Sequence, residues 1–170
     1  MKTAQNFGIY YLLMVIAQIV ISNYFLVSPL VTITILPALI LCIPGDMKTP
    51  LILLIAFATG LSADLLSEGV LGLNTLSLLP VALVKKTIMR AFFDRDSVER
   101  GTGFSFRRNG ALKISLALIT VISLFLIIYI AADGAGTREF IYNLSRFALS
   151  LLSSLIISLV CVHILTEEKR

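Results

Sequence analysis

The amino-acid sequence predicts an all-α, polytopic membrane protein with six transmembrane helices. Of its 170 residues, 58% are hydrophobic and 14% are charged, and the mean hydropathy is +0.97. Soluble domains are about 45–50% apolar and about 25% charged, so this composition belongs to a chain that lies in a bilayer. We expect one integral membrane domain over residues 1–170, because the length leaves no room for a separate soluble domain. The apolar runs place the spans at about 7–24, 30–43, 51–66, 71–84, 112–132 and 140–165.

The first two spans each have a competing interpretation. Span 7–24 follows a lysine, as the apolar core of a signal peptide would, but no small-residue cleavage site comes after it, so we expect an uncleaved helix. Span 30–43 is short, and its run Val31–Ile35 is rich in β-branched residues, which favour strands. An isolated strand in lipid leaves its backbone groups without hydrogen bonds. We therefore predict a helix here as well, kinked at Pro37.

The other four spans are delimited by polar segments. The third span follows the turn GDMKTP and is separated from the fourth by the short segment SEGV. Both are short for a bilayer, which a helix of about 20 residues crosses. The fifth span has no charge over twenty-one residues and ends at DGAGT, and the sixth runs up to the polar tail TEEKR.

Basic residues are divided unequally between the two sides that six spans define. One side has the N-terminus, the turn before the third span, the loop 85–111 and the C-terminus, and the other side has only Arg138 and Arg146 as basic residues. The positive-inside rule then predicts that both termini are cytoplasmic. The twelve basic residues of the cytoplasmic side are Lys2, Lys48, Lys85, Lys86, Arg90, Arg95, Arg100, Arg107, Arg108, Lys113, Lys169 and Arg170.

The basic loop 85–111 is the only long connection. Val84, Ile88 and Phe92 recur every fourth residue, so we expect the fourth span to continue as a helix along the membrane surface. Two interpretations of its basic side chains stay open: a docking site for a cytoplasmic partner, or an anchor on anionic lipid headgroups. A membrane surface explains the neighbouring phenylalanines better than nucleic acid does, so no nucleic-acid partner is expected.

An acidic stripe follows the third span. Ala56, Gly60, Asp64 and Glu68 recur every fourth residue and so share one face of a helix. The two small residues let another helix approach closely. The two carboxylates lie toward the outer end, and an acidic group at membrane depth normally faces protein or water.

A second polar stripe lies in the sixth span. At 1.5 Å per residue, its arginine and the two carboxylates stand at similar heights above the cytoplasmic ends of their helices. We therefore predict an ion pair of Arg146 with Asp64 or Glu68 that joins the third and sixth spans. The alternative is that all three side chains snorkel to the outer water. The stripe consists of Asn143, Arg146, Ser150, Ser154 and Ser158.

The turn that follows the carboxylates is rich in glycine. Gly69 and Gly72 suit a tight turn and a close approach between helices, and Asn74, Thr75 and Ser77 can hydrogen-bond across helices. No catalytic or metal-binding set is evident, because the single histidine, His163, is expected at the opposite end of the bundle. Both cysteines lie in apolar runs, where free thiols are usually buried and inert. We expect no enzymatic activity and no cofactor.

The stretch GLSADLLSEGVLGLNTLSL between the third and fourth spans resembles MreD, a family of bacterial rod shape-determining membrane proteins. That family has an acidic residue and then a Gly-rich turn with a G-L-(N/H) element, and its length, span count, basic loop and short charged tail are also similar. The resemblance implies an inner-membrane component of cell-wall elongation that pairs with the bitopic protein MreC, near MreB and the RodA–transpeptidase synthase. It also implies a fold similar to the S components of energy-coupling-factor transporters. The matching residues are Gly60, Asp64, Leu65, Leu66, Gly69, Leu71, Gly72, Leu73 and Asn74.

Two functions stay open. The favoured one is a non-enzymatic scaffold whose outer turn or lateral groove binds the transmembrane helix of MreC by close packing. The alternative is a solute-binding S component of a vitamin transporter, which needs a cavity with several convergent polar groups. The chain has no tryptophan and few polar side chains near the outer turns, which disfavours the alternative. The candidate structural or partner-binding residues are Gly60, Asp64, Glu68, Gly69, Gly72, Asn74 and Arg146.

Overall fold

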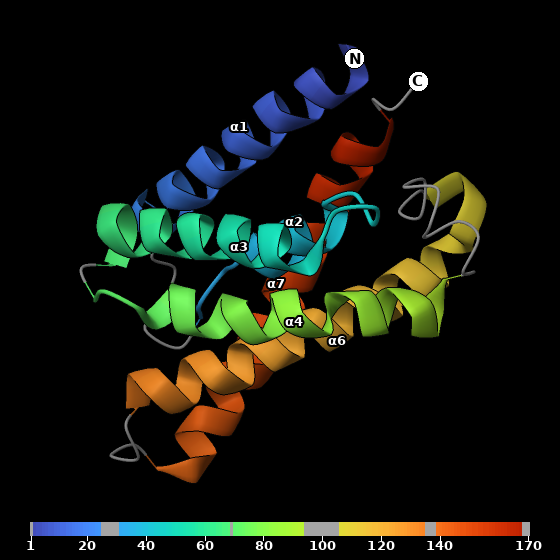
Figure 1. The fold of residues 1–170 in the computed structure, drawn as a ribbon. Coiled ribbons are helices and arrows are strands. Elements are labelled where there is room, and N and C mark those ends of the chain that lie inside the picture. Colours follow the sequence, from blue (N-terminus) through green and yellow to red (C-terminus); the bar gives the residue numbers. More distant parts are fainter. Residues whose placement is uncertain (1, 25–30, 69, 94–105, 135–138, 168–170) are drawn as a thin grey trace.

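The computed structural model describes residues 2–24, 31–68, 70–93, 106–134 and 139–167. These parts of the chain are mostly helical, and none of them is a β-strand paired in a sheet, which confirms the predicted all-α class (Figure 1). The α-helices are α1 (Lys2–Tyr24), α2 (Leu36–Cys42), α3 (Thr49–Ala63), α4 (Leu73–Phe92), α6 (Phe106–Gly134) and α7 (Phe140–Glu167), and a π-helical turn, η1 (Asp64–Glu68), directly follows α3.

Four stretches of helix are long and apolar enough to cross a membrane. They are Phe7–Tyr24, Thr49–Ser67, Gly110–Gly134 and Phe140–Ile164. They confirm the first, third, fifth and sixth predicted spans, with ends that differ by at most a few residues. The described chain is therefore an integral membrane protein by length and composition.

The second predicted span is wrong as a continuous helix. Residues 31–35 are not helical, and α2 has only 7 residues. Pro37 lies in the first turn of α2, where a proline needs no kink, so the predicted kink is also wrong.

The fourth predicted span continues farther than residue 84, as expected for a helix that enters the loop. α4 runs to Phe92, and α6 begins at Phe106, so the loop 85–111 is shorter than predicted. The prediction that Lys85 faces the membrane surface is wrong. Its side chain is 1% exposed, and its Nζ donates to the carbonyl oxygen of Ile43. A buried ammonium needs such an acceptor, and the end of α2 supplies it.

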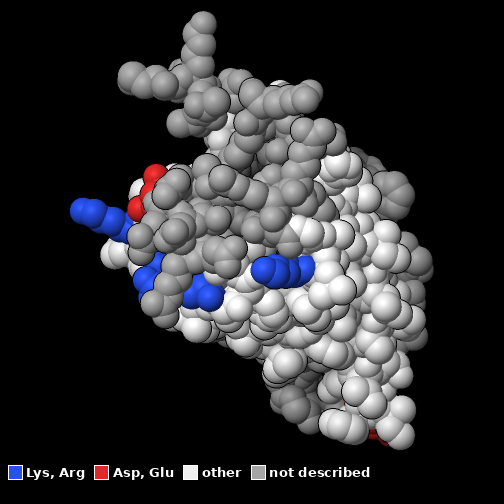
Figure 2. Space-filling model, turned by 90° about the vertical axis from the view of Figure 1, so that its right-hand side faces the viewer, with Lys and Arg blue, Asp and Glu red and all other residues white. Residues whose placement is uncertain are grey.

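The two ends of the bundle are those that the sequence predicts. In Figure 1 both termini, the α2–α3 turn and the α4 and α6 ends that face the long connection lie toward one end, and the η1–α4 turn and the α6–α7 junction lie toward the other. Figure 2 views the first end and shows blue side chains on it. Its described, at least partly exposed basic side chains are Lys48, Lys86, Arg90 and Lys113. The assignment of this end to the cytoplasm stays a prediction of the positive-inside rule.

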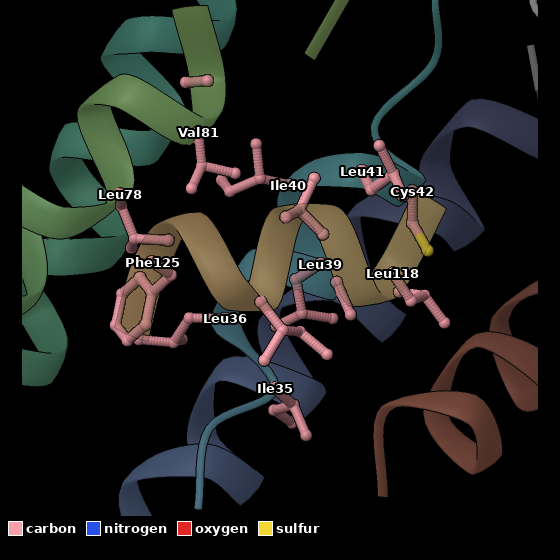
Figure 3. Close-up of a cluster of buried hydrophobic side chains, with 14 of the residues drawn as sticks. Ile35, Leu36, Leu39, Ile40, Leu41, Cys42, Leu78, Val81, Leu118 and Phe125 are labelled. Carbon is pink, nitrogen blue, oxygen red and sulfur yellow. The ribbon is translucent and has the colours of Figure 1, made fainter. Parts of the chain in front are cut away.

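The hydrophobic core surrounds α2. All seven α2 residues are buried, and their side chains meet Leu78 and Val81 of α4 and Leu118 and Phe125 of α6 (Figure 3). The outer surfaces of the long helices are apolar as well, with exposed leucines and isoleucines throughout α1 and α7. This pattern is expected where the surroundings are lipid.

Candidate functional site

The first polar cluster lies at the turn between η1 and α4, and its centre is Asp64. The positive-inside rule predicts that this turn is on the outer side, and we call it the outer turn. The Asp64 side chain is completely buried. Its Oδ1 accepts a hydrogen bond from the backbone N–H of Asn74 at 2.8 Å. Its Oδ2 accepts from the N–H groups of Gly72 and Thr75, both at 3.1 Å, and from Thr75 Oγ1 at 2.6 Å.

These bonds supply the N-terminus of α4 with the acceptors that it lacks. The first N–H groups of a helix have no partner within the helix, and the capping residue of α4, Gly72, has no side chain to offer one. Asp64 takes that role from the preceding helix, and its negative charge meets the positive end of the α4 dipole. Gly72 has φ +96°, a left-handed conformation that favours glycine. The predicted tight turn at Gly72 is therefore confirmed.

The small residues of the same stripe bring α3 against α4. A Cβ atom at Gly60 would lie 2.6 Å from Thr75 Cα and 2.9 Å from Thr75 N, distances at which something must shift. Ala56, one turn earlier, is completely buried. The stripe of Ala56, Gly60 and Asp64 thus faces α4, as the sequence predicts for a close helix contact. The side chain of Glu68 and the whole of Gly69 lie outside the described residues.

Asn74 joins this cluster through its backbone. Its side chain is 4% exposed, and the bond from its N–H to Asp64 links it to the preceding helix. Thr75 gives two bonds to the same carboxylate, which confirms the prediction that it hydrogen-bonds across helices.

The predicted ion pair between Arg146 and Asp64 is wrong. Arg146 Nη1 pairs with Asp133 Oδ2, and Nη2 donates to Thr32 Oγ1 at 3.2 Å. The Arg146 guanidinium also lies 5.8 Å from the ring centroid of Tyr129. Within the described residues α7 packs on α6 and does not contact α3. Equal height along two helices therefore did not imply that Arg146 and Asp64 face each other.

The serine stripe of α7 and one glutamine of α1 supply the hydrogen bonds of residues 31–35. The N–H of Thr32 donates to Ser150 Oγ at 2.9 Å. The N–H of Thr34 donates to Ser154 Oγ at 3.0 Å, and that hydroxyl donates back to the Thr32 carbonyl at 3.3 Å. Ser150 and Ser154 thus hydrogen-bond the backbone groups of this segment that point toward α7.

Gln18 of α1 hydrogen-bonds the backbone groups on the opposite edge of the same segment. Its Oε1 accepts from the N–H of Ile35 at 2.8 Å, and its Nε2 donates to the Ile33 carbonyl at 3.0 Å. Partners that alternate between two sides are those of an extended strand. Irregular backbone is tolerated at membrane depth where protein groups satisfy it, which is why the β-branched run could remain extended here.

Three residues of these networks were not predicted. Asp133 was assigned only to the end of the fifth span, Thr32 only to a β-branched run, and Gln18 to none of the polar stripes. The signal for Gln18 was available, because a lone amide in an otherwise apolar span needs partners inside the protein.

The described residues offer little that resembles a catalytic centre. No group of three or more His, Cys, Asp and Glu side chains lies close enough to hold a metal ion among them. Cys42 and Cys161 are buried and are not joined in a disulfide. All four contacts of Asp64 are to donors of its own chain, so this carboxylate builds the turn. The fold and its polar networks define a helical integral membrane protein in which most, but not all, of the buried polar groups of the described residues have a hydrogen-bond partner inside the chain.

Comparisons with protein families, with curated proteins and with solved structures find no match for this chain. The likeness to MreD therefore rests on the quoted stretch and the chain's general features, and the S-component-like fold stays a prediction.

Proposed function

We propose that this protein is a non-enzymatic scaffold of the bacterial cell-wall elongation machinery, of the MreD type. It would lie in the inner membrane with both termini in the cytoplasm. It would bind the transmembrane helix of an MreC-like bitopic protein and reach MreB, RodA and its transpeptidase directly or through that partner. The observation that supports this proposal is the role of Asp64: the residues that resemble MreD build one braced turn at the outer end of the bundle.

The braced turn presents apolar side chains to its surroundings. Leu65, Leu66, Val70 and Leu71 are each more than half exposed. We call these four residues the outer apolar patch. Asn23 Nδ2 donates to the Leu66 carbonyl at 2.9 Å and so attaches α1 to the same turn. An apolar surface on a turn held by buried hydrogen bonds suits the end of a partner's membrane helix, because little entropy is lost when a rigid surface binds.

A photo-crosslinking experiment tests the proposal. The full chain is co-expressed with the MreC-like protein of the same organism, with p-benzoylphenylalanine at Leu66 or Leu71. The matched control is Leu152 of α7, which is 61% exposed, close to the 62% and 67% of the two test positions. Crosslinks to the partner from the two test positions, with none from the control, support the proposal. Equal crosslinking at all three, or no complex at all, rejects it.

One observation favours the solute-binding alternative. Asn143 Oδ1 and Arg146 Nε are buried and have no hydrogen-bond partner within the described chain, and a bound solute would satisfy both. Native mass spectrometry of protein purified from its own membrane separates the two functions. A stoichiometric small molecule without a single-span partner supports the carrier, and a stoichiometric single-span protein supports the scaffold.

A further inference from the structure

The serine stripe of α7 extends one serine farther than the segment 31–35 whose backbone it hydrogen-bonds. Ser150, Ser154 and Ser158 are all completely buried. The first two bind the backbone at Thr32 and Thr34. Ser158 Oγ has no hydrogen-bond partner among the described residues. Burying a hydroxyl without a hydrogen-bond partner costs free energy, so the lack of a partner for Ser158 needs a physical explanation.

The spacing of the stripe identifies which backbone groups Ser158 would meet. Four residues of α-helix rise about 6.0 Å, and two residues of extended chain rise about 6.6 Å. Serines at every fourth position therefore stay in register with every second residue of the strand. Ser154 accepts from the Thr34 N–H and donates to the Thr32 carbonyl. One step farther along, the same pattern pairs Ser158 with the Leu36 N–H and the Thr34 carbonyl.

The helical start of α2 prevents that pairing, and this first turn is only weakly stabilised. Ile35 has φ −106° and ψ −6°, which turns the chain into the helix. The Leu36 N–H then donates to Thr34 Oγ1 over 3.4 Å, a long bond. Leu36 also precedes Pro37, and a residue before proline is disfavoured in the α conformation.

We propose that the segment 31–42 has a second, less populated state. In that state Ile35 and Leu36 are extended, and Ser158 Oγ accepts from the Leu36 N–H and donates to the Thr34 carbonyl. The bond from Leu39 N to the Ile35 carbonyl, 3.1 Å in the structure, is lost, which makes this state the minor one.

The change would act along the axis of the bundle. Each residue that passes from helix to strand lengthens the chain by about 1.8 Å, so two residues move α2 by about 3–4 Å. The segment is attached at one end to Arg146 through Thr32 and at the other end to Lys85 through Ile43. It therefore links the outer end of the molecule to the end with the basic side chains. The inference does not depend on which partner binds outside.

Fluorine NMR of the full chain in lipid nanodiscs tests this inference. The reporter is trifluoromethyl-phenylalanine at Asp46, an exposed position in the turn that follows α2. Two-state equilibria of this kind populate the minor state at about 0.1–10%, so a second, exchanging resonance is expected. Ser158→Ala should reduce its population at least about tenfold, because a bond made only in the minor state is removed.

Two further variants keep the result interpretable. Pro37→Ala removes the bias of Leu36 against helix and should lower the minor population several-fold, even if Ser158→Ala does not fold. Ser153→Ala is the matched control, because Ser153 Oγ donates to carbonyls of its own helix, those of Leu149 and Ser150, and it should leave the population unchanged. The absence of a second resonance in the parent protein overturns the inference. So does an equal population in the parent and in whichever of the Ser158 and Pro37 variants folds.

Discussion

Replacing Asp64 with alanine is the most informative single perturbation of the outer turn. The carboxylate is completely buried and is the common acceptor of three backbone N–H groups and one hydroxyl. Alanine at position 64 leaves all four donors without that acceptor, and the N-cap Gly72 cannot replace it. The change removes one side chain and leaves the N-terminus of α4 without the capping carboxylate that it has in the structure.

The expected loss of stability follows from this count. A buried donor left without a partner costs about 1–3 kcal/mol, and loss of a helix cap costs about 0.5–2 kcal/mol. Gly72 is only half-buried, so water can reach its N–H and its contribution is small. The other three donors are the N–H groups of Asn74 and Thr75 and the Thr75 hydroxyl. They share one carboxylate, so we take the lower end of the range for each and expect Asp64→Ala to cost about 3–4 kcal/mol in total. For a chain of this length that corresponds to a fall in Tm of about 6–16 °C.

The chain is suited to a thiol-based unfolding assay. It has no tryptophan, but Cys42 and Cys161 are buried and are not joined in a disulfide, so a fluorogenic maleimide reports unfolding in detergent. Asp46→Ala, in an exposed turn, is the control and should change stability by less than about 0.5 kcal/mol. Thr75→Val, which removes only the hydroxyl donor, should cost about 1 kcal/mol alone and less in the Asp64→Ala background. A loss under about 1 kcal/mol for Asp64→Ala refutes the capping role.

Three other perturbations test the rest of the polar interior. Gly60→Ala should cost about 1–3 kcal/mol, because its Cβ would lie 2.6 Å from the backbone of α4, while Gly8→Ala, with nothing within 4 Å, should be neutral in the same thermal assay. Arg146→Asp should be strongly destabilising and partly rescued by Asp133→Arg, and the absence of rescue in the double variant contradicts the pairing. Gln18→Leu leaves one strand N–H and one carbonyl unpaired and should cost about 2–4 kcal/mol; a Tm equal to that of the parent would show that water or lipid headgroups replace the amide.

Much of the fold was predictable because it depends on properties that follow the chain. Long apolar runs predicted four spans with nearly correct ends, and the spacing of Val84, Ile88 and Phe92 predicted that α4 continues past the fourth span. The small-residue stripe predicted that Gly60 faces another helix, and the structure identifies that helix as α4.

The second span was mispredicted for a specific physical reason. The argument against a strand assumed that its backbone would face lipid, and it faces Ser150, Ser154 and Gln18 instead. These residues lie 15 or more positions away along the chain, so local propensity could not reveal them. The β-branched run indicated the correct local conformation, but hydrogen bonds from α1 and α7 are what make that conformation possible in a bilayer.

By itself the sequence determined the four long helices that are apolar enough to cross a membrane, which end of the bundle is basic, and which side chains share a face of a helix. These properties depend on composition and helical period alone. Tertiary structure alone decided which partner each polar group has: Asp64 meets the start of α4, Arg146 meets Asp133, and Lys85 meets the end of α2. A sequence gives the height of a side chain along its helix, whereas the direction in which that side chain finds a partner depends on how all the helices pack together.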